Sequence, residues 1–316
     1  MKTYVPNYYN EFKCIADKCR HSCCIGWDVE IDADTLEKYK NSRHTLADRI
    51  RAQICTEEDG SYFKMKEDGR CPFLQNDGLC EIIKVLGENE LCDICRLHPR
   101  FKNVFTDRVE IGLGACCEEA ARIILTWDKP FALVLTEGRE ECNTDFEEEL
   151  LSKRDEMLMI MSSDKMLSEK LSLIADIFDL QRAVNKDKNY LALFKSLEYM
   201  KPDLICLIES IEKNALFSSE KIYNCISELE KPMSSVATYF VFRHISPAEN
   251  RAELRARCAL VLLLMRLALA IVATDYERFM LEENSAELLR IISSEIEYSP
   301  DNMEILLSEL DFDLNF

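Results

Sequence analysis

The cysteines of this chain are concentrated near its amino terminus, and this concentration limits what the region can fold into. Eleven of the fifteen cysteines in the 316-residue chain fall within the first 117 residues. Thiolates gathered in a small volume bind zinc or iron–sulfur clusters. We therefore predict a region whose loops are held by a metal centre. The nine expected ligands are Cys14, Cys19, Cys23, Cys24, Cys71, Cys80, Cys92, Cys95 and Cys117.

The start of the chain and its longest apolar run favour a reducing compartment. Residues 1–6 lack the apolar stretch and the small-residue cleavage site of a secretory signal. The run 258–273 is apolar but carries Arg266 near its middle, so we expect a buried helix rather than a membrane span. We therefore expect a cytoplasmic protein with no membrane partner. There, thiols stay reduced, and metal binding is favoured over disulfides.

The charge of the chain argues against nucleic acid as a partner. The formal net charge is −19, and residues 126–316 carry most of it. Such a surface repels nucleic acids and anionic membranes and attracts basic partners, although acidity also simply keeps a protein soluble. The sequence contains no P-loop, no G-x-S-x-G motif and no complete dinucleotide fingerprint.

The apolar patterns predict a mainly α protein. A loop-rich cysteine and metal module with a few short strands (1–128) is expected to pack on an all-helical carboxy-terminal domain (129–316). We expect strands over 61–65 and 104–113. We expect helices over 32–40, 117–127, from 145 to about 161, from 167 to about 178, and over 191–200, 203–213, 218–229, 234–244, 247–281 with a break, 285–297 and 300–310.

Local geometry limits how the cysteines can share metals. The turn signal at 76–78 brings Cys71 and Cys80 close at low entropic cost. Neighbouring side chains in extended backbone point in opposite directions, so Cys23 and Cys24 are not expected to bind the same ion. The same reasoning applies to Cys116 and Cys117. One cluster with spare thiols and two separate sites both stay open, as do iron–sulfur and zinc.

The remaining cysteines and the histidines have plainer interpretations. His21 is either an alternative ligand or a solvated loop residue. His98 lies in a basic stretch, 96–100, that either balances cluster charge and holds an anionic cofactor or is a solvated turn. Five cysteines are expected to be small buried hydrophobic residues: Cys55, Cys142, Cys206, Cys225 and Cys258.

Several motifs together resemble the flagellin lysine-N-methylase family. They are Phe12–Cys19 through Cys23–Trp27, Cys71–Leu74 with Gly78–Cys80, Leu86–Glu88 followed by Cys92 and Cys95, Cys117–Arg122, Tyr239–His244 and Glu295–Ser299. The segments span nearly the whole chain, and the cysteine motifs are the most specific of them. The amino-terminal part is also similar to a broader group of zinc- or iron-chelating cysteine-rich domains.

The resemblance implies an activity, cofactors and a partner. It implies transfer of a methyl group from S-adenosylmethionine to lysine side chains of flagellin, in a protein that carries an iron–sulfur cluster, expected to be 4Fe-4S. Candidate contacts with the methyl donor are Trp27, Arg96, Arg100 and Arg122, and no catalytic residue is assigned. The alternative is a non-catalytic metal-binding module whose acidic helical domain binds a basic protein partner.

Overall fold

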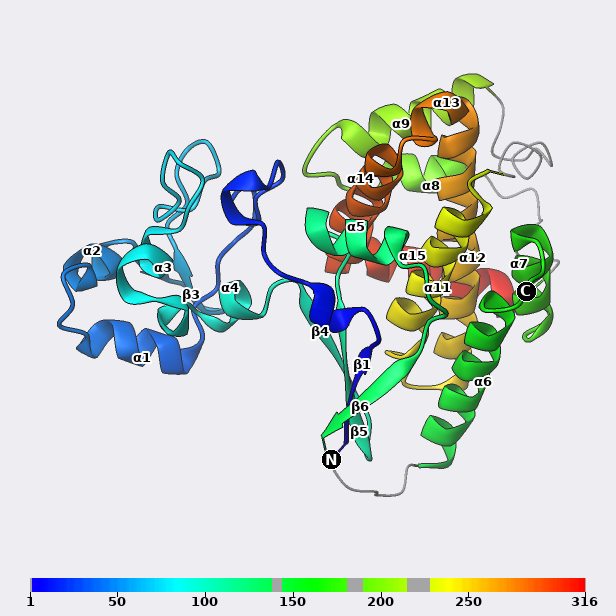
Figure 1. Ribbon diagram of the computed structural model, residues 1–316, viewed down its shortest axis with the longest axis horizontal. Helices are drawn as coiled ribbons and strands as arrows, with labels where there is room; N and C mark the ends of the chain where they lie inside the picture. The colour runs from blue at the N-terminus through cyan, green and yellow to red at the C-terminus, as the bar shows by residue number, and fades with distance from the viewer. Residues whose placement is uncertain (1, 138–143, 181–189, 215–227, 316) are drawn as a thin grey trace. The chain divides into compact units, whose positions relative to one another are not determined.

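The computed structural model describes residues 2–137, 144–180, 190–214 and 228–315, and its contacts divide the chain into two compact units (Figure 1). We call Lys13–Phe101 with Cys117–Glu119 the cysteine unit. Met1–Phe12, Lys102–Cys116 and Ala120–Phe316 form the helical unit. The mainly α fold class is confirmed. The separate folding of 1–128 and 129–316 stays a prediction.

The cysteine unit is built from short elements joined by loops, as predicted. Its helices and strands are η2 (Ala16–Lys18), α1 (Ala33–Asn41), α2 (Ala47–Ala52), β2 (Ile54–Thr56), β3 (Ser61–Phe63), α3 (Glu81–Leu86), η3 (Glu88–Glu90) and α4 (Asp93–Leu97). The predicted helix over 32–40 is α1, because Asp32 caps it by accepting a hydrogen bond from the Thr35 N–H at 2.9 Å. The strand predicted over 61–65 is β3, which pairs with β2 in an antiparallel ribbon.

The helical unit begins with a small mixed sheet. Its strands are β1 (Lys2–Pro6), β4 (Arg100–Val104), β5 (Arg108–Leu113) and β6 (Leu133–Glu137), in the order β4-β5-β1-β6. β1 runs parallel to β5 and antiparallel to β6. The strand predicted over 104–113 is confirmed over 108–113 as β5, while Val104 belongs to β4. The chain turns back between β4 and β5, and the Phe105 N–H donates to the Arg108 carbonyl at 2.9 Å.

Helices make up the rest of the helical unit. They are η1 (Tyr9–Glu11), α5 (Glu118–Thr126, whose first two residues belong to the cysteine unit), α6 (Asp145–Met161), α7 (Leu167–Asp176), α8 (Tyr190–Ser196), α9 (Asp203–Asn214), α11 (Glu230–Ile245), α12 (Arg251–Thr274), α13 (Tyr276–Phe279), α14 (Glu282–Ile292), the π-helix η4 (Ser293–Glu297) and α15 (Pro300–Asn315). The predicted helical succession is therefore confirmed where the structure describes it. Residues 218–227 of one expected helix lie outside the described residues.

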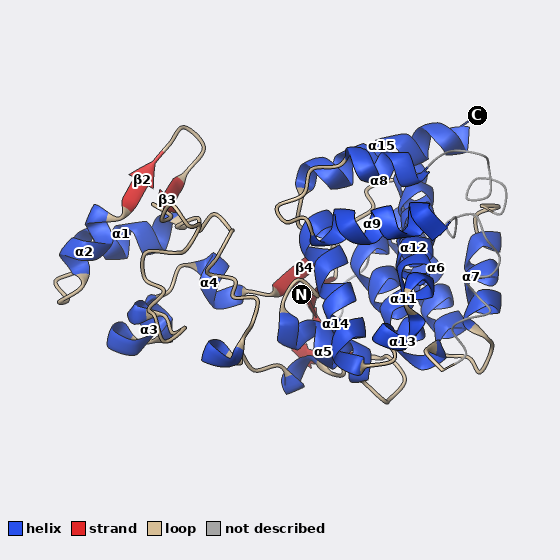
Figure 2. Ribbon diagram, turned by 90° about the horizontal axis from the view of Figure 1, so that it is seen from above, coloured by secondary structure: helices blue, strands red, loops and turns tan. Residues whose placement is uncertain are grey.

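Helix α12 forms the centre of the helical core. It packs against α7, α9, α11, α13, α14 and α15, which Figure 2 shows around it. By length and composition α12 could cross a membrane, yet 83% of its most apolar window is buried inside the protein, as in the core helix of a globular fold. The prediction of a buried helix over the run 258–273 is confirmed.

The five cysteines expected to be buried behave differently from one another. Cys258 is fully buried in α12, where burial raises its pKa to about 12. Cys55 is half-buried, and its Sγ donates to the Tyr62 carbonyl at 3.4 Å. Cys206 is exposed, which contradicts the expectation, because it lies on a face of α9 away from the buried Leu204 and Ile208. Cys142 and Cys225 lie outside the described residues.

Candidate functional site

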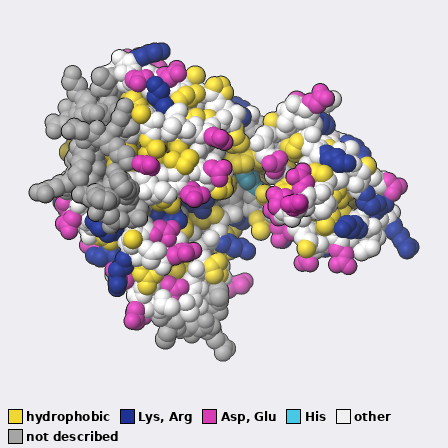
Figure 3. Space-filling view, turned by 180° about the vertical axis from the view of Figure 1, so that it is seen from behind, with side chains coloured by type: hydrophobic (Ala, Val, Ile, Leu, Met, Phe, Trp, Pro, Cys, Tyr) yellow, Lys and Arg dark blue, Asp and Glu magenta, His cyan; other side chains and the backbone are white. Residues whose placement is uncertain are grey.

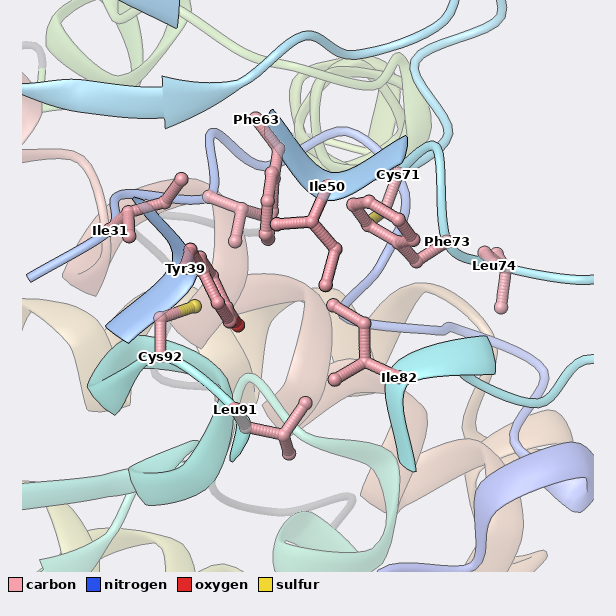
Figure 4. Close-up of a cluster of buried hydrophobic side chains, with 11 residues drawn as sticks. Ile31, Tyr39, Ile50, Phe63, Cys71, Phe73, Leu74, Ile82, Leu91 and Cys92 are labelled. Atoms are coloured by element: carbon pink, nitrogen blue, oxygen red, sulfur yellow. The ribbon is translucent and has the colours of Figure 1, made fainter. Parts of the chain in front are cut away.

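One group of thiols lies against the apolar core of the cysteine unit. Cys71 and Cys92 are themselves core residues, 6% and 1% exposed, and Figure 4 shows them in one cluster with Tyr39 and Phe73. Three partly buried cysteines pack against the same cluster. We call these five the inner thiol group: Cys24, Cys71, Cys80, Cys92 and Cys95.

Local backbone structure brings the inner thiol group together from four separate segments. The Cys71 N–H donates to the Cys24 carbonyl at 2.8 Å, which joins two of the segments directly. The predicted turn at 76–78 is confirmed, since Leu74 and Cys80 face each other in an antiparallel bridge. Gly78 supplies the positive φ of +79° that this reversal needs. The fourth segment is the first turn of α4, which holds Cys92 and Cys95.

Hydrogen bonds between neighbouring thiols lower the pKa of the accepting sulfur and raise the pKa of the donating one. The sulfurs of Cys92 and Cys95 lie 3.5 Å apart, and this hydrogen bond lowers the pKa of Cys92 while it raises that of Cys95. A bond from the Cys23 thiol likewise lowers the pKa of Cys24 to about 7, with help from Ser22. Cys24 and Cys92 are therefore the thiols most ready to become thiolates, the form that binds metals.

Burial and crowding act on the other inner thiols. Burial raises the pKa of Cys71 to about 12, and the neighbouring Cys24, Cys80 and Cys92 add to the rise. Burial also raises the pKa of Cys80. A positively charged metal would reverse these shifts, because it stabilises thiolates that otherwise repel one another.

A second set of thiols is more exposed. Cys14 and Cys23 are exposed, and Cys19 and Cys117 are half-buried. Cys14 and Cys117 act electrostatically on both Cys19 and Cys23, so the four are close neighbours. We call them the outer thiol group. Burial raises the pKa of Cys19 to about 11.

An ion pair ties Cys117 to the first cysteine segment. Glu118 accepts from the Arg20 Nε at 2.9 Å and from the Arg20 N–H at 2.8 Å. The Cys19 thiol also donates to Glu118, at 3.8 Å. Because these contacts fix residues 117–119 beside residues 19–20, Cys117 reaches the outer thiol group from nearly a hundred residues along the chain. Cys116, its neighbour, is 6% exposed and belongs to the helical unit.

The thiol donors fit a soft metal, but the sulfur atoms of the described residues are not close enough together to coordinate one. Every cysteine that the structure describes is a thiol outside any disulfide. Within residues 2–137, 144–180, 190–214 and 228–315, no three Cys, His, Asp or Glu side chains converge tightly enough to hold an ion as they stand. A bound metal would have to draw the sulfurs inward. The nine ligand assignments stay predictions.

The two histidines near the cysteines differ in protonation. Burial lowers the pKa of His98 to about 4, with a contribution from Arg100, so its ring is neutral at pH 7. Whether residues 96–100 stabilise cluster charge or hold an anionic cofactor, as opposed to forming a solvated turn, stays a prediction. His21 is half-buried and lies within the segment of the outer thiol group.

The four predicted contacts of the methyl donor are divided between the two units. Arg96 pairs with Asp93 on α4 at the surface. Trp27 and Arg100 are half-buried in the cysteine unit, and Arg122 is exposed on α5 in the helical unit. None of the four lines either of the two cavities described below. Their role stays a prediction.

The helical unit holds a cavity of about 910 Å³. Its walls come from β4, the start of α6, the end of α11, the turn after it, and η4 with the start of α15. A second cavity in the same unit, of about 550 Å³, lies beside Trp127 and Ser234. Cysteine spacing gave no reason to expect either of them.

A buried carboxylate with three donors lies at the wall of the larger cavity. Glu297 Oε1 lies 2.9 Å from His244 Nε2, and Oε2 accepts from the Tyr239 hydroxyl at 2.7 Å and the Ser293 hydroxyl at 2.6 Å. Burial raises the pKa of Glu297, but the electrostatic interaction and hydrogen bond with His244, together with Arg243 and the Ser293 hydroxyl, outweigh burial and leave that pKa lowered. Burial lowers the pKa of His244. The pair is therefore an ionised carboxylate beside a neutral imidazole.

The π-helix explains how Glu297 reaches α11. Its wider turn places Ser293 and Glu297 on the same face, where the hydroxyl of the first donates to the second. Single π turns recur at functional sites of proteins. The segments 239–244 and 295–299 had been noted only for their resemblance to family motifs. Spacing in sequence could not show that they meet, because 53 residues separate His244 from Glu297.

On the face drawn in Figure 3, side chains of one charge sign do not gather into one large patch. Figure 3 shows acidic and basic side chains interspersed over the face in view, with apolar patches among them. The net charge of −19 thus belongs to the whole chain and not to one patch on that face.

These features define a class of protein: a mainly helical protein with a candidate soft-metal centre. Its cysteine-rich unit has two thiol groups, and its helical unit has a cavity with polar walls. Comparison with known proteins identifies the family to which the chain belongs. The Lysine-N-methylase of Salmonella typhimurium is 31% identical over 138 residues, which cover 42% of this chain and 34% of that protein. The Lysine-N-methylase of Salmonella choleraesuis is 33% identical over the same length.

A shorter relative is covered more fully. The Flagellar biosynthetic protein FliU of Salmonella muenchen is 30% identical over 140 residues, which cover 42% of this chain and 82% of that protein. This chain belongs to the lysine-N-methylase and FliU family, which confirms the resemblance seen in the sequence. It spans about a third of the length of the two lysine-N-methylases it matches. No family model and no solved structure matches the chain.

Proposed function

We propose that this protein methylates lysine side chains of flagellin, with S-adenosylmethionine as methyl donor. The observation that carries the proposal is the 31% identity with a protein named Lysine-N-methylase. The printed name of FliU, a flagellar biosynthetic protein, supports flagellin as the substrate. The acidic chain is suited to a lysine-bearing partner, because its field raises the local concentration of cations.

The chemistry sets two demands on the protein. A lysine amine with a pKa near 10.4 is neutral in only about one molecule in a few thousand at pH 7, so the enzyme has to remove its proton. The amine, the methyl carbon and the sulfonium then have to lie in line. As the carbon–nitrogen bond forms, the carbon–sulfur bond breaks and its electron pair stays on sulfur. The lysine proton passes to a base, ultimately to solvent.

We propose that the inner thiol group holds an iron–sulfur cluster. Five thiols line one apolar cluster, and four are enough for a 4Fe-4S centre. Burial of Cys71 and Cys92 supports a structural role, since a cluster there would fix the loops around it. Zinc is the other occupant that the same donors accept. Anaerobic analysis of iron, sulfide and zinc separates them, and iron–sulfur protein absorbs near about 400 nm while zinc protein is colourless.

Methyl transfer is tested directly. Metal-loaded protein, prepared without oxygen, is incubated with purified flagellin and S-adenosylmethionine labelled in its methyl group. We expect label in flagellin lysines, located by mass spectrometry, and none in flagellin whose lysines have been chemically blocked. Full metal loading without any transfer would overturn the proposal and favour a metal-binding module that recognises a basic partner. We further propose that the protein acts in the cytoplasm, where flagellin is made and thiols stay reduced.

A further inference from the structure

The larger cavity of the helical unit contains a buried polar group without a partner. Asn103, at the end of β4, is 4% exposed and lines the cavity, and its Nδ2 amide group has no hydrogen-bond partner. Buried amide groups in native proteins nearly always have partners, because losing their contacts with water costs free energy. An unpaired amide in a cavity wall therefore indicates a ligand that supplies an acceptor oxygen.

Other polar groups in this wall already have partners within the protein. Glu297 accepts from three side chains. Arg257 pairs with Glu253 and donates to the His244 carbonyl. Glu147 is occupied in the capping box of α6. The polar groups named here are thus held by bonds within the protein, whereas the Asn103 Nδ2 group, also in the wall, has no hydrogen-bond partner.

The lining indicates which kind of ligand fits. Lys102 precedes Asn103 in β4 and also lines the cavity, but its exposed side chain leaves the strand on the opposite face from the buried Asn103. A carboxylate would therefore accept a hydrogen bond from the Asn103 amide, while Lys102 adds positive charge at the cavity rim. The rings of Phe105, Phe146 and Tyr298 offer faces for a flat base. Glu249 lies in the same lining and offers a carboxylate to an ammonium group. Carboxylate, ammonium and purine are the three recognition groups of an adenosyl amino acid.

Size agrees with this class of ligand. Sites for small molecules of this kind enclose roughly 300–1,000 Å³, and the cavity holds about 910 Å³. The second cavity is smaller, about 550 Å³, and the residues with unpaired atoms there, Trp127 and Ser234, are only half-buried. The larger cavity is therefore the better candidate.

We infer that this cavity binds the methyl donor S-adenosylmethionine, with the Asn103 amide donating to its carboxylate and Lys102 adding positive charge at the cavity rim. The inference rests on the proposed function and adds a location to it. The donor site then lies in the helical unit and is built without any cysteine. Asn103 and Lys102 are binding residues and take no part in proton transfer.

The test measures binding of the product, S-adenosylhomocysteine, by calorimetry on the full metal-loaded protein. Asn103→Asp keeps the side-chain size but replaces the donor with a carboxylate, and we expect binding at least about tenfold weaker. Lys102→Glu alters an exposed residue and leaves the core intact, and we expect binding about threefold to tenfold weaker. The matched control is Lys231→Glu, an exposed residue of the smaller cavity, which should bind as the unaltered protein does.

Each outcome decides the inference. Unchanged affinity in both variants overturns it, as does equal weakening in Lys231→Glu or the lack of any binding by the unaltered protein. Lys102→Glu decides alone if Asn103→Asp does not fold. The proposed function fails in a different way. Weaker binding in both variants, without methyl transfer to flagellin, would support the cavity as the donor site and contradict flagellin as the substrate. Methyl transfer to flagellin, with unaltered binding in both variants, would support the substrate and contradict the cavity as the donor site.

Discussion

The two units of this protein reach stability by different means. The core of the cysteine unit is a single cluster in which Cys71 and Cys92 stand among a few apolar side chains, and five thiols contribute to its packing. The helical unit has α12, which buries most of its length against six other helices. Small regions with little apolar core depend on metals or crosslinks, while large helical cores do not. The comparison teaches that the cysteines replace hydrophobic burial where that burial is scarce.

The largest effect is expected from removing an inner thiol. Cys92→Ser should lose most of its metal and unfold the cysteine unit, because metal binding supplies about 10 kcal/mol to the folding of small metal-held modules. Metal content per chain and two-step thermal unfolding measure this. The helical transition should stay in place. Cys55→Ser, outside both thiol groups, is the control, and equal metal content in the two variants would contradict the expected role of Cys92.

A second large effect is expected within the helical unit alone. Arg154 and Glu110 are both fully buried and paired, and Arg154 Nη2 donates to Glu110 Oε1 at 3.1 Å. Arg154→Met leaves the buried Glu110 carboxylate with only the longer contact to Arg108 Nη1, at 3.7 Å, and should lower the free energy of unfolding by about 3–5 kcal/mol. Urea unfolding measures the change. Lys153→Met, one residue earlier, removes only a partly exposed surface pair with Glu156 and should be nearly neutral, and metal content should not change in either variant.

These two predictions also mark what the sequence alone could and could not show. Helices such as α1 and α6 were predictable because caps and apolar periodicity are local signals. The packing of five cysteines at one apolar cluster agrees with the clustering of cysteines in the sequence, while their binding of a metal stays a prediction. The division into inner and outer groups was not predictable, because Cys117 depends on the Arg20–Glu118 pair. Asn103 gave no signal, since its significance lies in a missing bond.

A moderate effect is expected from pH. Burial holds the pKa of His244 below its usual value, so the unfolded chain binds a proton more readily than the folded one. The stability that comes with the neutral ring is complete above the unfolded pKa of about 6.5 and declines as the pH falls below it toward the lowered folded pKa. The free energy of unfolding of the helical unit, measured by urea between pH 7.5 and 5, should therefore fall.

His244→Gln sharpens this test. It keeps a donor for Glu297 but has no titrating ring, so the slope of stability against pH between 7.5 and 5 should become shallower. Because the pKa of Glu297 is lowered, its protonation changes the free energy of unfolding only at more acidic pH and does not contribute to the slope between pH 7.5 and 5. An unaltered slope in the variant would show that other groups cause the pH dependence.

The smallest effect is expected from a cysteine outside both thiol groups. Cys206 is exposed on α9, in the helical unit. Cys206→Ser should change the free energy of unfolding by less than about 0.5 kcal/mol and leave metal content unaltered. Urea unfolding and metal analysis measure both. A loss of metal in this variant would break the comparison between the two units.

The cysteine unit interrupts the sequence of the helical unit, and this interruption sets an order of assembly. Strand β1 is synthesised before the whole Lys13–Phe101 segment, whereas its partners β5 and β6 are synthesised only after that segment. During that interval β1 exposes unpaired backbone groups, while most of the thiols have already been made and, if they bind the proposed metal, can begin to collect it. A cell short of metal would therefore leave an early edge strand unprotected for longer, and aggregation of nascent chains, rather than loss of activity alone, would be the first sign of starvation.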